Sequence, residues 1–309
     1  MEVDLKGRDI LSIHDLSREE LHHILDRAEF IKKGYLSGER IKPLEGKTLG
    51  MIFQKSSTRT RISFEVAMNQ LGGHALYLNA RDLQLKRGET IADTARVLSR
   101  FVDGIVIRTY SQQEVAELAQ YASVPVVNGL TDLLHPCQVL SDLLTIKEKL
   151  GRLAGITLLY LGDGNNIAHS LMLGGAKAGL NVTICTPEGR EPEASITHQA
   201  QKAARATGAK IELTTEPRQS IKEARVIYTD TWISMGREGE AVDIEIFKPY
   251  QVNRELLAQG HPEALVMHCL PAHRGEEITS EVIDGPQSIV FDQAENRLHL
   301  QKALLSLVL

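Results

Sequence analysis

The 309-residue chain contains little cysteine, few aromatic residues and no long apolar segment. Its three cysteines (Cys137, Cys185 and Cys269) are odd in number and far apart, which argues against a disulfide framework and favours a reducing compartment. No apolar run approaches the ~20 residues that span a bilayer. The first residues also lack the basic and apolar regions of a signal peptide. We therefore expect a cytoplasmic protein with no membrane partner.

An excess of positive charge is also absent. The chain has 40 Asp and Glu against 35 Lys and Arg, which gives a net charge of −5. Domains that bind nucleic acid usually carry a basic face, so we expect no nucleic-acid partner. The contents of hydrophobic residues (42%) and charged residues (24%) are typical of a globular protein. The length suits two domains of ordinary size.

Strand-like and helix-like segments alternate in two series along the chain. The capping box Ser-Arg-Glu-Glu at residues 17–20 predicts the start of a helix. Strands are expected near residues 49–53, 74–78, 104–108, 124–127, 156–161, 182–185, 211–214, 226–229, 265–270 and 289–291, and helices near residues 58–72, 90–101, 112–122, 136–150, 166–180, 193–207 and 294–309. This alternation predicts an α/β protein with two doubly wound domains whose parallel sheets flank a central cleft.

The segment at residues 57–61, Ser-Thr-Arg-Thr-Arg, joins an apolar strand to a helix. The start of a helix offers unpaired N–H groups and the positive end of the helix dipole. Hydroxyls and guanidiniums added at that point favour a site for phosphate or another compact oxyanion. The alternative is an ordinary helix cap with solvated arginines.

Other polar clusters follow the remaining predicted strands. Arg108 ends one strand, and Asp230 ends another beside the only tryptophan of the chain. His135 and Gln138 stand three residues apart at the start of the 136–150 helix, so both can face one ligand. Ligands of open parallel sheets bind beyond the carboxyl ends of strands. We therefore interpret these clusters as the lining of the cleft, with a capping histidine and an N-cap aspartate as the alternatives.

Two further patterns suggest cofactors without meeting their requirements. Residues 162–166, Gly-Asp-Gly-Asn-Asn, partly match a dinucleotide-binding turn, but Ile167 stands where the third glycine belongs. A tight turn that presents Asn166 fits better. Residues 268–275 hold Cys269 and two histidines, yet the chain lacks the spacing of a four-ligand zinc site. We expect neither a cofactor nor a metal.

Three motifs occur in the order and spacing of one known family. They are residues 57–61, residues 135–138 (His-Pro-Cys-Gln) and residues 268–271 (His-Cys-Leu-Pro). On these motifs the chain resembles the aspartate/ornithine carbamoyltransferase family over essentially its whole length. Residues 230 and 234–236 resemble the amino-acid loop of its ornithine-specific members. The resemblance implies transfer of the carbamoyl group of carbamoyl phosphate to the side-chain amine of L-ornithine, by direct attack without a covalent enzyme intermediate.

The resemblance also implies how the chain divides its tasks. Residues 1–135 would bind carbamoyl phosphate, residues 136–150 would link the domains, residues 151–293 would bind ornithine, and the helix at 294–309 would return to the first domain. The implied carbamoyl phosphate ligands are Ser57, Thr58, Arg59, Thr60, Gln84, Arg108, His135, Gln138 and Arg297, with Gln84 reaching a neighbouring subunit of a trimer. The implied ornithine ligands are Asn166, Asp230, Ser234, Met235, Cys269 and Leu270, and the implied catalytic residues are Arg108, His135, Asp230 and Cys269.

Three other functions stay open at this point. A nicotinamide-dependent dehydrogenase would leave residues 57–61 unexplained. A non-catalytic binding module of the same family would be expected to lack Arg59, His135 or the segment at residues 234–236, and all are present. The acceptor could also be another amine, such as putrescine or an acylated ornithine.

Overall fold

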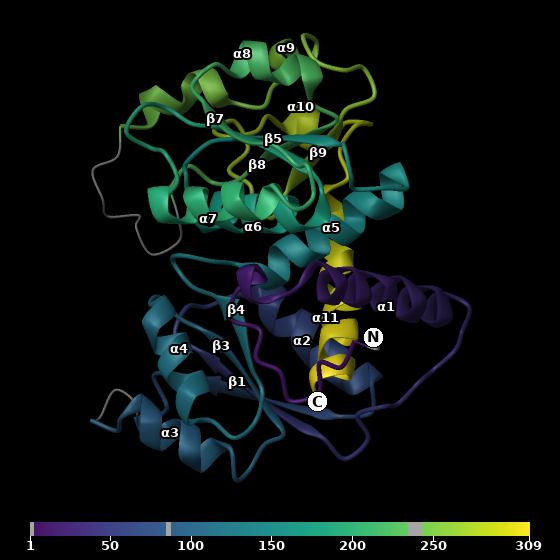
Figure 1. Ribbon diagram of the computed structural model, residues 1–309, viewed down its shortest axis with the longest axis vertical. Coiled ribbons are helices and arrows are strands. Elements are labelled where there is room, and N and C mark those ends of the chain that lie inside the picture. Colours follow the sequence, from purple (N-terminus) through teal and green to yellow (C-terminus); the bar gives the residue numbers. More distant parts are fainter. Residues whose placement is uncertain (1–2, 85–87, 234–242) are drawn as a thin grey trace. The chain divides into compact units, whose positions relative to one another are not determined.

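The chain folds into two compact units. The computed structural model describes residues 3–84, 88–233 and 243–309. Unit 1 comprises Met1–Leu144 with Glu295–Leu309, and unit 2 comprises Thr145–Ala294. Two long helices, α5 (Pro136–Leu150) and α11 (Val290–Val308), each carry the chain from one unit into the other (Figure 1). The chain therefore crosses between the units twice, inside a helix each time.

Unit 1 is built on a parallel sheet with the strand order β2-β1-β3-β4. Besides parts of α5 and α11, its elements are η1 (Ile13–Asp15), α1 (Arg18–Leu36), β1 (Thr48–Phe53), α2 (Thr58–Gln70), β2 (His74–Asn79), α3 (Ile91–Leu98), β3 (Gly104–Arg108), α4 (Gln112–Tyr121) and β4 (Val126–Leu130). Ile105 and Ile107 of β3 pack with Ala95 of α3 and Val115 of α4 in one apolar cluster. Helices α3 and α4 therefore cover one face of this sheet, while α2 and α11 lie on the other (Figure 1).

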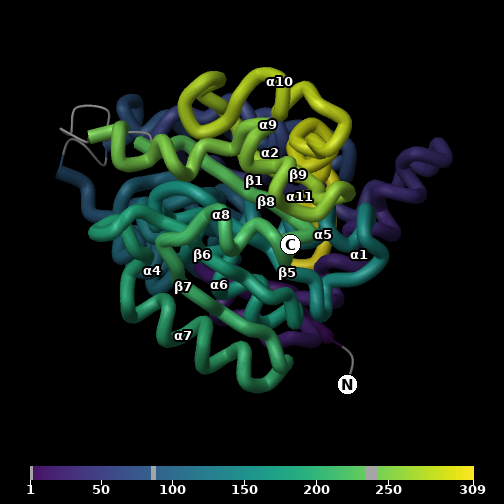
Figure 2. The backbone as a smooth tube through the Cα atoms, turned by 90° about the horizontal axis from the view of Figure 1, so that it is seen from above, coloured from purple at the N-terminus to yellow at the C-terminus, as the bar shows by residue number. Residues whose placement is uncertain are grey.

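Unit 2 is built on a second parallel sheet, with the order β7-β6-β5-β8-β9. Its remaining elements are β5 (Thr157–Leu161), α6 (Asn166–Ala178), β6 (Asn181–Cys185), α7 (Ala194–Ala204), β7 (Ile211–Thr214), α8 (Pro217–Ser220), η3 (Ile221–Glu223), β8 (Val226–Thr229), η4 (Ile244–Tyr250), α9 (Arg254–Leu257), β9 (Leu265–His268) and α10 (Ser280–Ile283). Helices α6 and α7 lie on one side of the sheet, and α9 and α10 lie on the other (Figures 1 and 2). The predicted α/β class with two parallel sheets is confirmed.

Most predicted elements appear within a few residues of their expected bounds. The capping box at the start of α1 is present, because Glu20 N–H donates to Ser17 Oγ at 3.0 Å and Ser17 N–H donates to Glu20 Oε2 at 2.7 Å. Strand β4 begins two residues later than predicted. Pro125 has no N–H for the ladder, although its carbonyl accepts from Ile105 N–H at 2.9 Å.

The prediction of a strand at residues 289–291 is wrong. Ile289 N–H bonds to Val266 O at 2.9 Å, so the chain touches the edge of the sheet there. Gln293 N–H then bonds to Ile289 O at 2.9 Å, which is the first turn of α11. The β-forming residues of this segment are therefore overruled by their tertiary setting, and the last helix begins four residues before the predicted 294.

Each sheet has one topological switch point. In unit 1 the chain leaves β1 for β2 on one side and later adds β3 on the other. In unit 2 it runs from β5 through β6 to β7 and then returns to add β8 beside β5. Ligands of open α/β sheets bind outside the carboxyl ends of the strands at such points. The fold therefore predicts ligand-binding residues at 54–61 and 108 in unit 1, and at 162–166 and 230 in unit 2.

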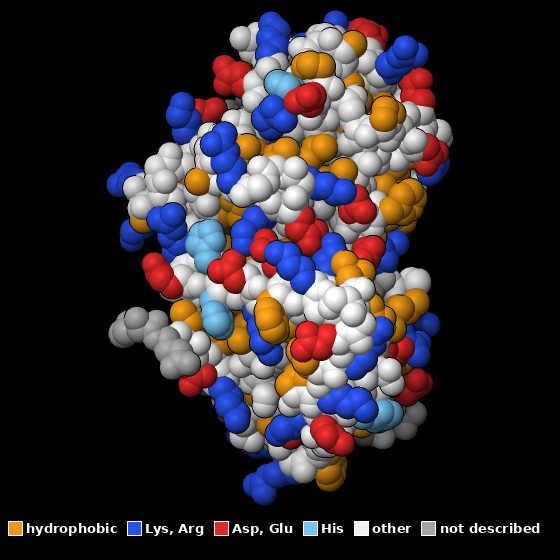
Figure 3. Space-filling view, turned by 90° about the vertical axis from the view of Figure 1, so that its right-hand side faces the viewer, with side chains coloured by type: hydrophobic (Ala, Val, Ile, Leu, Met, Phe, Trp, Pro, Cys, Tyr) orange, Lys and Arg blue, Asp and Glu red, His pale blue; other side chains and the backbone are white. Residues whose placement is uncertain are grey.

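The surface carries charges of both signs. On the face drawn in Figure 3, Lys and Arg side chains are interspersed with Asp and Glu side chains. Among the described residues, none of the helices has both the length and the hydropathy that a membrane crossing requires.

Candidate functional site

The first group of predicted residues lies at the start of α2 in unit 1. Ser57 is the N-cap, and its Oγ accepts from Thr60 N–H at 3.1 Å. Thr60 is buried, whereas Thr58 is exposed and Arg59 is half-buried. Arg61 belongs to a different environment, because its Nε donates to Glu65 at 2.9 Å and its guanidinium lies 3.8 Å from the Tyr77 ring centroid. Arg61 is therefore engaged by its own helix and by β2, whereas Arg59 faces His135 closely enough to lower its pKa.

A buried chain of hydrogen bonds ties α2, α5 and α11 together. Arg297 donates from Nη2 to Thr60 Oγ1 at 3.1 Å and from Nη1 to Gln138 Oε1 at 2.5 Å. The other end of the Gln138 amide donates to Asp142 Oδ1 at 2.8 Å. Because Asp142 accepts from Nε2, the amide oxygen is fixed toward Arg297. Asp142 was not predicted, and no motif in the sequence singles it out.

His135 is buried among positive charges at the start of α5. Burial lowers its pKa well below the ordinary value of 6.5, and three nearby guanidiniums lower it further. They are, in decreasing order of effect, those of Arg297, Arg108 and Arg59. The imidazole is therefore neutral at pH 7 and can donate one hydrogen bond without carrying a charge. The structure thus brings together five predicted residues, Arg59, Thr60, Arg108, His135 and Arg297, with Gln138 beside them.

Two other residues of unit 1, Cys137 and Gln84, lie in contrasting environments. Burial raises the pKa of Cys137 to about 12, so its thiol stays protonated and is a poor nucleophile. Gln84 lies exposed on the segment after β2. Its predicted contact with a neighbouring subunit stays a prediction.

In unit 2, a carboxylate and a thiol lie at the switch point between β5 and β8. Asp230 follows β8 and is 8% exposed. Its Oδ1 accepts from Cys269 Sγ at 3.0 Å, and its Oδ2 accepts from Asn165 Nδ2 at 3.0 Å. Asp230 and Cys269, both expected in the site, are therefore in direct contact, with Leu270 next along the chain and half-buried.

Asn165, the neighbour of the predicted Asn166, donates a hydrogen bond to Asp230. Asn165 is the N-cap of α6 and also accepts from Ile167 N–H at 2.9 Å, whereas Asn166 is the first residue of the helix and is half-buried. An asparagine immediately before a helical pattern is an N-cap signal, and this signal could have identified Asn165 from the sequence. The predicted ligands Ser234 and Met235 lie outside the described residues.

The glycines near Asn165 are explained by packing. A Cβ on Gly164 would lie 2.4 Å from the backbone of Glu191 and Pro192, so only glycine fits there. Ile167, where a dinucleotide fingerprint has its third glycine, is 2% exposed. Gly164 is therefore explained by the close approach of residues 191–192, and a buried isoleucine stands at the position of the third glycine.

Among the described residues, two groups of side chains have metal-ligand types within 4.8 Å of one another: Asp230, His268 and Cys269, and His273, Glu276 and Glu277. His268 does not fit a metal, because both of its ring nitrogens are engaged within the chain, by Leu270 N–H at 2.8 Å and by Glu277 Oε1 at 2.9 Å. The same carboxylate oxygen also accepts from His273 N–H at 2.7 Å. His268 and Glu277 therefore act as internal hydrogen-bond partners.

Both halves of the chain match one known family. Residues 8–148 match the carbamoyl-P binding domain of aspartate/ornithine carbamoyltransferases, and residues 154–308 match the Asp/Orn binding domain. An ornithine carbamoyltransferase from Thermococcus kodakarensis is 58% identical over 100% of this chain and 98% of its own length.

Solved structures agree as well. The ornithine carbamoyltransferase from Pyrococcus furiosus superposes with a TM-score of 0.97 at 56% identity, covering 99% of this chain and 98% of that one. The ornithine carbamoyltransferase from Thermus thermophilus superposes with a TM-score of 0.86 at 43% identity, covering 96% and 97%. Two matching domain models that together span nearly the whole sequence, and relatives this similar, lead to one conclusion: the chain belongs to the aspartate/ornithine carbamoyltransferase family.

Proposed function

We propose that this enzyme transfers the carbamoyl group of carbamoyl phosphate to the side-chain amine of L-ornithine, giving L-citrulline and phosphate. The ornithine carbamoyltransferases among its relatives support the ornithine specificity. The observation that carries the chemistry is the buried group formed by Thr60, Gln138 and Arg297 around the neutral His135. This group combines hydrogen-bond donors with concentrated positive charge, which a carbamoylated phosphate requires.

The reaction needs no covalent intermediate on the enzyme. The amine nitrogen forms a bond to the carbamoyl carbon, and the bond from that carbon to the phosphate oxygen breaks. Negative charge develops on the carbamoyl oxygen and then on the leaving phosphate. In our proposal Arg108, His135 and Thr60 donate to the carbamoyl oxygen, at about 3 kcal/mol per donor. The phosphate is bound at the start of α2 by Ser57, Thr58, Arg59, Thr60 and Arg108. Gln138 also contacts the carbamoyl group, with Arg297 nearby.

The neutral state of His135 suits this role. A neutral imidazole donates a hydrogen bond but gives up its proton with difficulty, so it polarises the carbamoyl group without protonating it. Burial and three guanidiniums maintain that state at neutral pH. We therefore assign His135 to the stabilisation of charge and not to acid catalysis.

The amine substrate is assigned to unit 2. We propose that Asp230 binds the amino group, with Asn166, Ser234, Met235, Cys269 and Leu270 as further contacts. The amine must lose a proton before it attacks, since an alkylammonium has a pKa of about 10.4. We propose that the departing phosphate takes this proton and that Cys269 orients the amine. A pH–rate profile left unchanged by Cys269→Ala would eliminate the thiol as the base, whereas loss of the ascending limb would show that the thiol takes the proton.

A panel of amines tests the proposed substrate. The purified enzyme is assayed with carbamoyl phosphate and, in turn, L-ornithine, putrescine and N-acetylornithine, with carbamoylated product and released phosphate both measured. We expect L-ornithine to have the highest kcat/KM. A higher kcat/KM for putrescine would overturn the assignment of the acceptor but not the carbamoyl transfer itself.

The functional assembly is proposed to be a trimer in which Gln84 of one subunit contacts the carbamoyl phosphate bound to its neighbour. The exposure of Gln84 within its own chain supports this assignment. Light scattering gives the number of subunits. Mixing inactive Gln84→Ala chains with inactive Arg59→Ala chains tests the sharing, since mixed trimers regain activity only if the two residues act from different subunits.

A further inference from the structure

A fully buried His–Glu pair lies behind the segment that carries Cys269 and Leu270 in unit 2. His268 and Glu277 are both 0% exposed. Leu270 N–H donates to His268 Nδ1 at 2.8 Å, so Nδ1 carries no proton. The ring proton is therefore on Nε2, which lies 2.9 Å from Glu277 Oε1 and donates to it. The two hydrogen bonds therefore run in one direction: Leu270 N–H donates to the His268 ring, and the ring donates to the Glu277 carboxylate.

Leu270 has a backbone conformation that must be held in place. Its φ is +59°, and among the described residues it is the only non-glycine residue with a positive φ. A branched side chain rarely adopts this left-handed region, because Cβ then crowds the backbone. The hydrogen bond from Leu270 N–H to the His268 ring opposes the return to an extended conformation.

Cys269 lies between His268 and Leu270 in the chain, so the position of its thiol depends on the backbone conformation of both. Its thiol donates to Asp230 Oδ1 at 3.0 Å. If Leu270 turned to an extended conformation, the peptide that follows Cys269 would rotate and carry the thiol away from Asp230. The backbone of His268 is itself fixed, since its N–H donates to Gln293 Oε1 at 2.9 Å.

Glu277 is well placed to hold the ring. Besides the ring, its Oε1 accepts from His273 N–H at 2.7 Å, which anchors the carboxylate to the loop that follows Leu270. The adjacent Glu276 differs: it is half exposed, and its Oε2 lies 3.4 Å from His273 Nδ1. The chain thus offers a matched pair of neighbouring glutamates, one buried against His268 and one at the surface.

We propose that Glu277 is a positioning residue for the amine site. Acting through the Nε2–H tautomer of His268, it holds Leu270 in the left-handed conformation. It thereby preserves the hydrogen bond from the Cys269 thiol to Asp230. Its effect on the amine rests on the proposed function, whereas its effect on the thiol does not.

The experiment compares Glu277→Leu, Glu277→Gln and the control Glu276→Leu in the full-length enzyme. The substrate-free readout is the rate at which iodoacetamide alkylates Cys269, located by peptide mass mapping. The kinetic readout is KM for L-ornithine and, separately, for carbamoyl phosphate. Circular dichroism confirms that each variant is folded.

We expect Glu277→Leu to alkylate about tenfold faster, because its thiol no longer donates to an anionic neighbour. Its KM for L-ornithine should rise about tenfold, while its KM for carbamoyl phosphate should stay unchanged. Glu277→Gln retains an acceptor oxygen and should remain within about twofold of the parent in each measurement. Glu276→Leu should match the parent.

Several results would overturn the proposal. One is alkylation of Glu277→Leu at the parent rate, another is a rise of both KM values together, and a third is a loss in Glu277→Gln as large as in Glu277→Leu. If Glu277→Leu does not fold, Glu277→Asp replaces it, since the shorter side chain keeps the charge but withdraws the carboxylate from the ring. Should L-ornithine prove not to be the substrate, the alkylation rates still decide whether Glu277 positions the thiol.

Discussion

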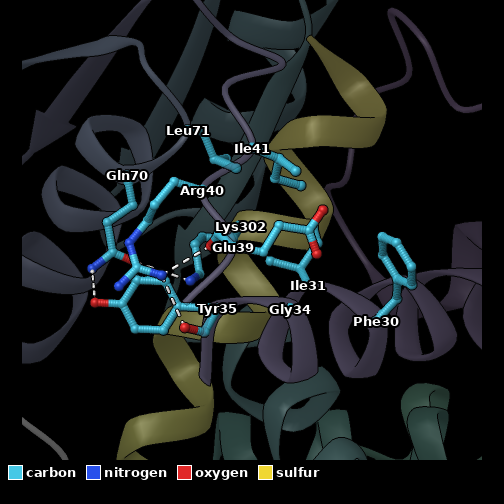
Figure 4. Close-up of a pocket in the computed structure, with 10 residues that line it drawn as sticks. All are labelled: Phe30, Ile31, Gly34, Tyr35, Glu39, Arg40, Ile41, Gln70, Leu71 and Lys302. Carbon is cyan, nitrogen blue, oxygen red and sulfur yellow. Dashed lines mark hydrogen bonds between the residues drawn. The ribbon is translucent and has the colours of Figure 1, made fainter. Parts of the chain in front are cut away.

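Replacement of Lys302 by methionine should change how the stability of the protein depends on pH. Lys302 lies on α11, is 1% exposed and lines a small cavity in unit 1 (Figure 4). Its Nζ donates to Gln70 Oε1 at 2.9 Å and lies 4.0 Å from the centroid of the Tyr35 ring. The guanidinium of Arg40 lies 4.2 Å from the same centroid. A buried ammonium therefore shares an aromatic ring with a second cation.

The magnitude follows from the pKa of this ammonium. Burial, and then the charge of Arg40, lower the pKa of Lys302 to about 8, whereas an unfolded chain has a lysine pKa of about 10.4. Between these two values the unfolded state binds more protons than the folded state, so the free energy of unfolding rises with pH. From pH 7 to pH 9 the gain is about 1.3 kcal/mol, and it nears 3 kcal/mol above pH 10.4.

Urea unfolding at fixed protein concentration, repeated at pH 7, 8 and 9, measures this gain. Other titrating groups cancel when the stability of Lys302→Met is subtracted from that of the parent, so the difference should move by about 1.3 kcal/mol in favour of the parent. Lys33→Met, at an exposed position of α1, is the control and should show no such movement. A parent-minus-Lys302→Met difference that is flat with pH would refute the reasoning.

Three further variants test other parts of the structure. Thr60→Val keeps the side-chain shape but removes the oxygen that accepts from Arg297, so kcat should fall about 100-fold in a steady-state assay. Ser17→Ala removes the capping box of α1 and should lower the free energy of unfolding by about 1 kcal/mol, with kcat unchanged. Gln301 is fully buried, and among the described residues its amide finds no hydrogen-bond partner. Gln301→Leu should therefore stabilise the protein by about 1 kcal/mol in urea unfolding.

Local patterns in the sequence predicted the alternation of strands and helices well. The capping box fixed the start of α1, and the 136–150 helix has the predicted bounds. These signals succeed because each depends on residues a few positions apart. The segment at residues 289–291 failed for the same reason: its apolar residues suit a strand, and only the rest of the fold makes them begin α11.

The polar contacts of the site were predicted less completely. The residues after each strand could be located, because parallel strands place their carboxyl ends at one edge of a sheet. What could not be predicted is which neighbours orient them. Asp142 and Glu277 resemble any surface carboxylate in the sequence, yet both are fully buried and accept hydrogen bonds from Gln138 and His268.

The last helix, α11, shows why the hydrogen-bond partners of site residues cannot be predicted from local sequence patterns. Its leucines predicted a docked helix, but a docked helix normally turns its polar residues to water. In α11 the polar residues Asn296, Arg297 and Lys302 are buried instead. Arg297 donates a hydrogen bond to Thr60, which lies 237 residues away in the sequence, and no local pattern extends that far. Since the desolvation of a guanidinium is costly unless it is well bonded, burial of Arg297 beside Thr60 and Gln138 is better explained by the proposed binding of carbamoyl phosphate than by the stability of the helix.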